Sequence, residues 1–331
     1  MKFKKCAALL LVSSCLLTGC TTSSAKKVDS KYVVASLEKG NKTKNIFADN
    51  LYKDIIDNSS NNSTVFNAVL QNLVDQKFPV NDDMKEDAAT IIKQIKSAYK
   101  SNYGDNYKDS LNQALTSAGY KNLSEYRQKM IKQIQYANFL LDYIDDHFDD
   151  VFNDYYQQCA PKYVSLIKIS VSDTSSPTDD ETSKLNEVKE LISNTDKSFG
   201  DIAQDYSDDS TSSKKGSLGI VDSKDTSGIA NSYGKDVFNA IEALSEGQVS
   251  DVITGDDGYY FVKVTSTDKK NLKKELKKTD IDSPLLAYDD YLQYVVYNSY
   301  KINYKDKDIK KIVQEVVNKA LEERKTERGE A

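Results

Sequence analysis

Histidine and cysteine, the residue types that most often bind metals or act as bases and nucleophiles, are scarce in this sequence. His147 is the only histidine and lies within a run of aspartates typical of a solvated helix surface. Three of the four cysteines fall in the first twenty residues, which leaves Cys159 alone in the body of the chain. The body can therefore form no internal disulfide and offers no zinc ligand set, so we expect no metal and no cofactor. Cys159 is predicted to be a small buried hydrophobe.

The first twenty residues have the features of an export signal. Basic residues precede an apolar run at 7–17 that is too short for a permanent membrane span. The run ends in the letters LTGC, which resemble the lipobox of bacterial lipoproteins and end at Cys20. The resemblance implies that residues 1–19 are removed and that diacylglycerol is attached to the Cys20 thiol. We therefore expect a lipid anchor on the extracytoplasmic face of a Gram-positive type cell membrane, with residues 20–31 as a flexible tether. The alternative is a generic secretory signal with an incidental cysteine.

The composition indicates a folded, charge-rich protein with room for two compact units. The chain has 331 residues, of which 39% are hydrophobic, and its 45 basic and 51 acidic residues give a net charge of −6. This mixed, mildly acidic balance argues against nucleic acid as a partner. The 22 tyrosines and the absence of tryptophan suit either ordinary helix packing or a wet groove that receives varied peptides.

Both ends of the chain are predicted to be mainly helical. A strand at 32–37 and a turn at Gly40 come first, and Asn122 and Glu125 have capping-box spacing before a long amphipathic helix. Each helix carries an apolar stripe that needs a partner, and the simplest arrangement packs the two ends together. The other predicted helices span 50–56, 63–78, 83–100, 107–118, 150–158, 268–278, about 284–300 and 307–323.

The middle of the chain alternates between strand and helix patterns. A strand at 163–171 and a polar loop at 172–183 precede helices at 184–193 and 199–206. A strand entry at 216–219 and a helix around 237–244 follow. A turn at Glu246-Gly247 leads to a short strand, and a last strand at 259–264 starts from an Asp-Asp-Gly turn. The order β-α-α-β-α-β-β predicts an α+β unit with one face of its sheet covered.

In that order and with those turns, residues 199–264 resemble a parvulin-type (PpiC, or rotamase) peptidyl-prolyl isomerase domain. The chain around them resembles the PrsA foldase lipoproteins, because VFNAVLQNLVDQKF is similar to the opening helix of PrsA and SurA chaperones and KINYKDKDIKKI to a PrsA closing segment. The resemblance implies a helical chaperone domain formed by both chain ends, with the parvulin-type domain inserted. The implied boundaries are 32–160 and 269–325 for the helical domain and 161–268 for the insert, followed by a tail at 326–331.

Prolyl isomerisation needs a site that favours a twisted amide over a planar one. Rotation about the X-Pro bond meets a barrier of roughly 18–20 kcal/mol, and an apolar proline pocket with a few hydrogen bonds can lower it without a nucleophile. The family resemblance places two histidines and one Asp or Cys at the site. In this sequence the histidine positions fall on Leu166 and Tyr260, and the third falls on Asp209, which matches the family. Asp209 and Tyr260 are therefore the candidate catalytic residues, and Leu166 is a degenerate position.

The same resemblance implies a proline pocket. Leu218 matches the family leucine of a Gly-x-Leu-Gly turn, and Val237 stands where phenylalanine is usual. The adjacent Phe238 could replace that phenylalanine, and the pocket methionine position falls near Tyr233.

Three functions remain open at this stage. The first is a membrane-anchored foldase that binds unfolded exported proteins, with weak or lost isomerase activity in the parvulin-type domain. The second is an active peptidyl-prolyl isomerase, and the third is a surface lipoprotein that scaffolds envelope proteins. Family resemblance also makes a homodimer an expected partner state.

Overall fold

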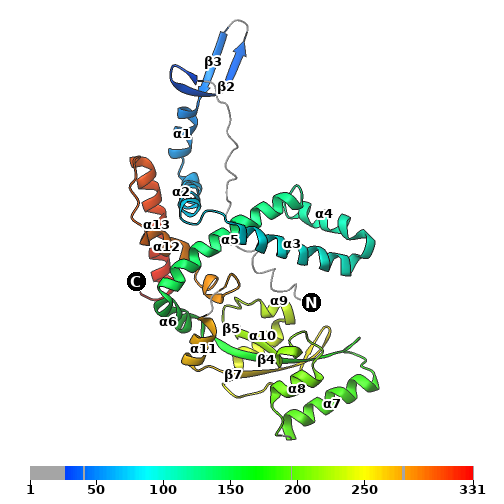
Figure 1. Ribbon diagram of the computed structural model, residues 1–331. Coiled ribbons are helices and arrows are strands. Elements are labelled where there is room, and N and C mark those ends of the chain that lie inside the picture. Colours follow the sequence, from blue (N-terminus) through cyan, green and yellow to red (C-terminus); the bar gives the residue numbers. More distant parts are fainter. Residues whose placement is uncertain (1–26, 40–41, 195, 278–279, 331) are drawn as a thin grey trace. The chain divides into compact units, whose positions relative to one another are not determined.

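The computed structural model describes residues 27–39, 42–194, 196–277 and 280–330 (Figure 1). The predicted signal and Cys20 lie outside the described residues. The described chain forms two compact units. Residues 80–290 make up one unit, and residues 27–79 together with 291–330 make up the other. Each is treated by itself below. The predicted domain boundaries stay a prediction.

The unit built from both chain ends is held together by helix α2 packed against α13. Phe66 of α2 is fully buried and stacks on Tyr294 at 4.9 Å between ring centroids, while Tyr297 meets it edge-on at 5.1 Å. Tyr52 donates a 2.6 Å hydrogen bond to Asp306, the residue that caps α13. The two ends of the chain thus pack together, the arrangement that their apolar stripes favour. Its elements are β1 (Lys27–Val28), β2 (Lys31–Lys39), β3 (Lys42–Phe47), α1 (Ala48–Ile56), η3 (Ser59–Asn61), α2 (Asn62–Lys77), α12 (Leu292–Ser299) and α13 (Lys307–Glu327).

Strand β3 was not expected from the sequence. It pairs antiparallel with β2, with Ser36 opposite Asn45 and a 2.9 Å hydrogen bond between their side chains. Four of its six residues are polar, and its two apolar residues, Ile46 and Phe47, are adjacent rather than alternating. Its strand character therefore comes from backbone pairing with β2 rather than from a pattern of apolar residues.

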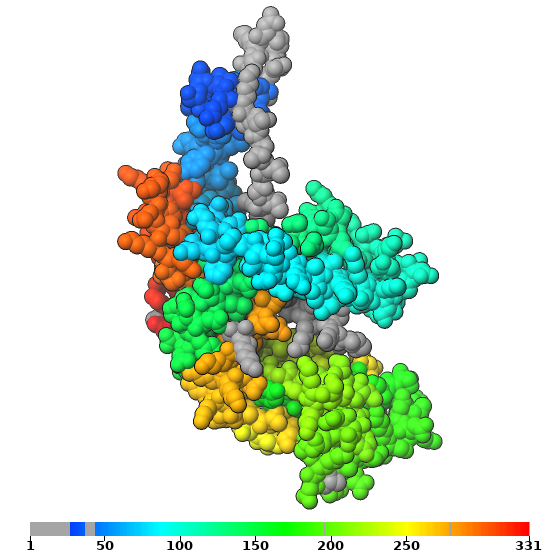
Figure 2. Space-filling model, viewed as in Figure 1, coloured from blue at the N-terminus to red at the C-terminus, as the bar shows by residue number. Residues whose placement is uncertain are grey.

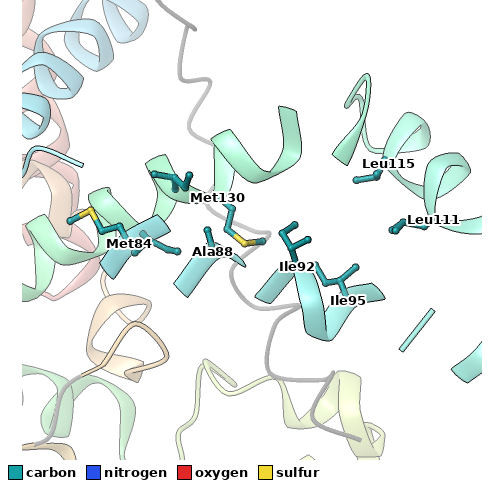
Figure 3. Close-up of a cluster of buried hydrophobic side chains, with 9 residues drawn as sticks. Met84, Ala88, Ile92, Ile95, Leu111, Leu115 and Met130 are labelled. Carbon is teal, nitrogen blue, oxygen red and sulfur yellow. The ribbon is translucent and has the colours of Figure 1, made fainter. Parts of the chain in front are cut away.

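Four helices open the other unit, and α3, α4 and α5 share one apolar core (Figure 3). Asn122 caps α5 as predicted, because its side chain accepts from the Glu125 N–H at 2.9 Å. The Glu125 carboxylate accepts from the Lys121 N–H instead of closing the box on Asn122. His147, at the junction of α5 and α6, is exposed, and Cys159 is buried, both as expected. The elements are α3 (Asp82–Tyr103), η4 (Gly104–Asn106), α4 (Tyr107–Ser117), α5 (Leu123–Asp146) and α6 (Phe148–Cys159).

A four-stranded antiparallel sheet in the order β5-β4-β7-β6 follows in the same unit. The α+β class agrees with prediction, and so does the order of strands and helices apart from the short helix α9, which was not predicted. The elements are β4 (Lys162–Ser170), α7 (Asp179–Asn194), α8 (Phe199–Tyr206), η5 (Ser212–Lys214), β5 (Ser217–Val221), α9 (Ile229–Tyr233), α10 (Lys235–Ala243), β6 (Ile253–Gly255), β7 (Gly258–Ser266), α11 (Lys269–Leu276) and η6 (Pro284–Leu286).

Both faces of this sheet are covered, which corrects the expectation of one covered face. Leu166 and Tyr260 pack toward α9 and α10, while their neighbours Ile167 and Phe261 pack toward α7 and α8. Adjacent strand residues point to opposite faces, so an uninterrupted apolar run such as Leu166-Ile167 indicates burial on both sides.

Two helix predictions need correction. Helix α7 begins at Asp179 rather than Lys184, because Thr178 and Glu181 form a capping box: the Thr178 N–H donates to the Glu181 carboxylate at 2.8 Å, and the Thr178 hydroxyl accepts from the Glu181 N–H at 3.3 Å. The helix predicted at about 284–300 is interrupted between η6 and α12. There Tyr288 is buried and donates a 2.7 Å hydrogen bond to Asp154, a tertiary contact that overrides helix propensity.

A buried polar contact joins α6 to the loop after β5. Tyr155 and Asp222 are both fully buried, and the tyrosine hydroxyl donates to the carboxylate at 2.8 Å. Burial, and then the charge of Asp222, raise the pKa of Tyr155 far above its ordinary value, so the phenol stays a neutral donor. The Ser223 N–H donates to the Cys159 carbonyl at 2.9 Å. The sheet is thereby attached to the helix that precedes it.

Candidate functional site

Most of the candidate site residues come together on one face of the sheet. Leu166, Val237 and Tyr260 are buried in one cluster, and partly exposed side chains edge it. The result is an apolar patch with a buried floor and a partly exposed rim. The rim candidates are Leu218, Tyr233 and Phe238.

Leu166 lies in the middle of β4, where a glycine brings the loop before β5 into close contact. Its N–H donates to the Gly216 carbonyl at 2.8 Å. Gly216 has φ of +74°, and a Cβ there would lie 2.4 Å from the Leu166 carbonyl oxygen, so only glycine fits without movement. Leu166 is fully buried and offers neither donor nor acceptor from its side chain. This position supplies packing and no polar group to the site.

Tyr260 is 2% exposed, and its hydroxyl donates to the carboxylate of Asp257. That carboxylate also forms an ion pair with Lys168, whose ammonium lies 5.6 Å from the centre of the Tyr260 ring. Burial first, and then the bond to Asp257, raise the pKa of Tyr260 above its ordinary value. The hydroxyl is therefore a neutral donor that is already engaged within the protein.

Asp209 lies in the loop after α8 and reaches the rim of the apolar patch. Its Oδ1 accepts from the Thr211 N–H at 2.8 Å and from the Tyr233 hydroxyl at 3.4 Å. The Tyr233 ring meets that of Tyr260 edge-on, with centroids 6.2 Å apart. Burial first, and then Asp209, raise the pKa of Tyr233. Asp209 and Tyr260 thus lie on either side of Tyr233 and share it as a neighbour, while the Tyr260 hydroxyl donates to Asp257.

Three residues of the site were missed from the sequence. Asp257 was noted only as part of a turn, and Lys168 only as a position in a strand. The Thr211 hydroxyl oxygen is buried without a hydrogen-bond partner, which leaves one unengaged donor in the Asp209 loop. The Asp-Asp-Gly turn could have pointed to Asp257, because an acidic turn residue next to a buried tyrosine is an available acceptor.

Comparison with known proteins identifies the domain that contains this patch. The family model for the PPIC-type PPIASE domain matches residues 166–266. This segment is a parvulin-type domain. Within the parvulin-type domain, β4 and β7 supply the two positions where the family resemblance implies histidine, and here they hold Leu166 and Tyr260.

Over part of its length the chain is also similar to PrsA foldases. It is similar to the foldase protein PrsA of Staphylococcus epidermidis, with 33% identity over 141 residues, or 40% of this chain and 41% of that protein. PrsA of Staphylococcus aureus is 32% identical over the same length. The matched region thus covers 41% of the length of these curated relatives. The crystal structure of PrsA from Bacillus subtilis is similar with 21% identity and a TM-score of 0.40, covering 86% of this chain and 98% of that one.

Two further properties concern the described residues alone. No helix among them combines the length and apolarity required to cross a bilayer. Within the same residues, no group of three or more histidine, cysteine or acidic side chains is arranged to hold a metal ion.

Proposed function

We propose that this chain is a foldase of the PrsA type that binds unfolded polypeptide outside the cytoplasm, anchored by a lipid on Cys20. Its parvulin-type domain contributes a proline-binding surface with weak or no isomerase activity. The clients are unfolded or partly folded exported proteins. The homodimer implied by the resemblance stays a prediction.

The observation that carries polypeptide binding is a group of exposed apolar side chains on β2 and α1. Five of the six large hydrophobic residues that are exposed in the described chain belong to these two elements, and each is 42% to 50% exposed. Helix α1 packs against β2, and apolar side chains exposed together on adjoining elements are typical of interaction sites. We name this group the apolar surface; its members are Tyr32, Val34, Leu51, Tyr52 and Ile55.

Weak or absent isomerase activity follows from the polar groups of the parvulin-type site. Leu166 cannot hydrogen-bond a twisted amide, and the Tyr260 hydroxyl is already bonded to Asp257. A bound proline would have to break that bond to use it. Differential stabilisation of the transition state is therefore small, although binding of the ring to the apolar patch is retained.

An aggregation assay with the chain from Cys20 onward tests the foldase proposal. The protein should suppress aggregation of an unfolded client at stoichiometric ratio, and the double variant Leu51→Gln/Ile55→Gln should lose most of that effect. Asp54→Gln, on the same helix, changes no apolar area and should behave as the parent. The proposal fails if the parent protein does not suppress aggregation, or if Asp54→Gln is as defective as the double variant.

An active isomerase is the second candidate, favoured by Asp209 at the rim of an intact apolar patch. A protease-coupled proline-peptide assay on the same protein separates the two. Our proposal predicts a rate close to the uncatalysed background. A clear rate enhancement that Asp209→Ala abolishes would establish the enzyme and contradict our proposal.

The anchor and the scaffold alternative have separate tests. Cys20→Ala should move the protein from the membrane fraction to the soluble fraction, and continued membrane attachment would refute the lipid anchor. Saturable binding to folded envelope proteins without binding to unfolded peptides would favour the scaffold.

A further inference from the structure

A basic pocket lies between α3, α4 and the beginning of α5, away from the parvulin-type site. It has a volume of about 450 Å³ and is lined chiefly by Lys93, Lys96, Lys100, Arg127, Tyr107 and Ala89. The space-filling view shows α3 and α4, in cyan and blue-green, at the surface of the molecule (Figure 2). Four cationic side chains around one hollow are notable in a chain whose net charge is −6.

The arrangement follows from the spacing along α3. Lys93, Lys96 and Lys100 are three and four residues apart, so they share one face of the helix, and like charges at that spacing destabilise a helix. Among the described residues, no carboxylate forms a salt bridge with any of the three. The favourable interaction of cations with a helix C-terminus is confined to the last turn, so it accounts for Lys100 but not for Lys93 or Lys96.

Arg127 provides a second, independent indication of an anionic ligand. Its Nη2 donates to the Lys85 carbonyl at 3.3 Å, which holds the guanidinium in place. Its Nε is buried and has no hydrogen-bond partner. A buried donor without an acceptor is costly. A carboxylate that pairs with this guanidinium, with a shift of the side chain that brings Nε to it, would remove that cost.

We propose that this basic pocket binds an acidic segment of an unfolded polypeptide, with Asp or Glu side chains paired to Lys96, Lys100 and Arg127. Ala89 and the half-buried ring of Tyr107 also line the pocket and offer apolar contacts. These contacts suit the methylene groups and backbone of a peptide. A phosphate polymer has no such apolar groups, so the lining favours a peptide. A protein of net negative charge repels acidic chains at long range, so holding them requires a local site of this kind. The pocket shares no residue with the apolar surface, and the proposal rests on the proposed function in that its ligand is a segment of a client. Its test measures peptide binding directly, so it can fail while suppression of aggregation is retained.

Direct peptide binding to the chain from Cys20 onward tests this. The probe is a short fluorescein-labelled peptide of alternating Glu and Ala, measured by fluorescence anisotropy at low salt, beside the same peptide with Gln in place of Glu. The Glu peptide should bind with an affinity that falls as salt is added, because exposed charges are screened. The double variant Lys96→Gln/Lys100→Gln should weaken binding about fivefold, given the usual strength of exposed ion pairs.

The matched control is Lys311→Gln/Lys319→Gln on α13, which makes the same change in net charge and replaces no residue that lines the pocket. It should leave the affinity within the error of the measurement. The proposal is overturned if this control weakens binding as much as the pocket variant, or if the Gln peptide binds equally well. It is also overturned if inorganic polyphosphate binds in a way that depends on Lys96 and Lys100 while the Glu peptide does not bind. Unchanged far-UV circular dichroism confirms that each variant is folded.

Discussion

Replacing Tyr155 by Phe removes one hydroxyl from the buried contact between α6 and the loop after β5. The ring, and its edge-on packing against Tyr288 at 5.3 Å, are retained. What is lost is the 2.8 Å hydrogen bond to Asp222, a carboxylate with no exposed surface. The substitution therefore isolates a single buried hydrogen bond.

The magnitude follows from the bonds that remain. Asp222 still accepts from the Thr226 hydroxyl and from the N–H groups of Lys224 at 3.0 Å and Thr226 at 3.2 Å. The carboxylate therefore keeps three hydrogen-bond donors in the Tyr155→Phe variant. The expected loss of unfolding free energy is that of one hydrogen bond to a charged group, about 2 kcal/mol. For a unit of this size that corresponds to a fall in Tm of about 4–8 °C.

Urea and thermal unfolding followed by far-UV circular dichroism measure this, since the chain has no tryptophan. The matched control is Tyr163→Phe, whose hydroxyl lies 2.8 Å from the Ser217 hydroxyl in a half-buried, uncharged pair. That control should cost about 0.5–1 kcal/mol. If Tyr155→Phe costs no more than Tyr163→Phe, Asp222 does not hold α6 to the sheet in the way described.

Three other changes have defined outcomes. Gly216→Ala should destabilise the protein by about 3 kcal/mol, because its Cβ would clash with the Leu166 carbonyl. The control Gly219→Ala has positive φ but open space around it, and should cost about 1 kcal/mol. Equal costs of the two changes in urea unfolding would contradict the close approach of Gly216 to Leu166. Lys162→Met should cost about 1–2 kcal/mol, because the ammonium donates to three carbonyls at the end of α10 at 2.7–3.1 Å; an unchanged urea midpoint would refute that role. Hydrogen bonds at the start of α7 lower the pKa of Glu181 from 4.5 to about 2. The stability it contributes is fully present above pH 4.5 and lost as the pH falls through about 2. The hydrogen-exchange protection factors of α7, which correct for the intrinsic exchange rate at each pH, should therefore fall over that range in the parent but not in Glu181→Gln.

Where apolar residues recur at helical spacing, the sequence was enough to find the elements. Helix α8 was predicted at its observed bounds, and α2 within one residue at each end. Strand β3 could not be predicted, because its residues do not alternate between polar and apolar and only the pairing with β2 makes them a strand. The break before α12 was equally hidden, since it depends on the contact of Tyr288 with the distant Asp154.

In the candidate site, too, some features could be predicted from the sequence and others could not. The proximity of Leu218, Phe238 and Tyr260 could be anticipated, because each lies on an element whose place in a parvulin-type order is fixed. The hydrogen-bond partner of the Tyr260 hydroxyl could not be predicted from the sequence. Asp209 and Asp257 were both available acceptors, and the short turn before β7 places Asp257 against the ring. Because the Tyr260 hydroxyl donates to Asp257, the Asp209 carboxylate accepts from the Tyr233 hydroxyl instead.

The buried carboxylate of Asp222 also bears on where the parvulin-type domain begins as a folding unit. The family match begins at residue 166, yet a hydrogen-bond partner of this domain's own Asp222 is Tyr155, on the preceding helix. A fragment cut at Lys162 would lose that donor and expose the Asp222 side of the loop to water. Experiments on the isolated domain therefore need fragments that start before Phe148, because a defect measured on a shorter piece would report the cut rather than the site.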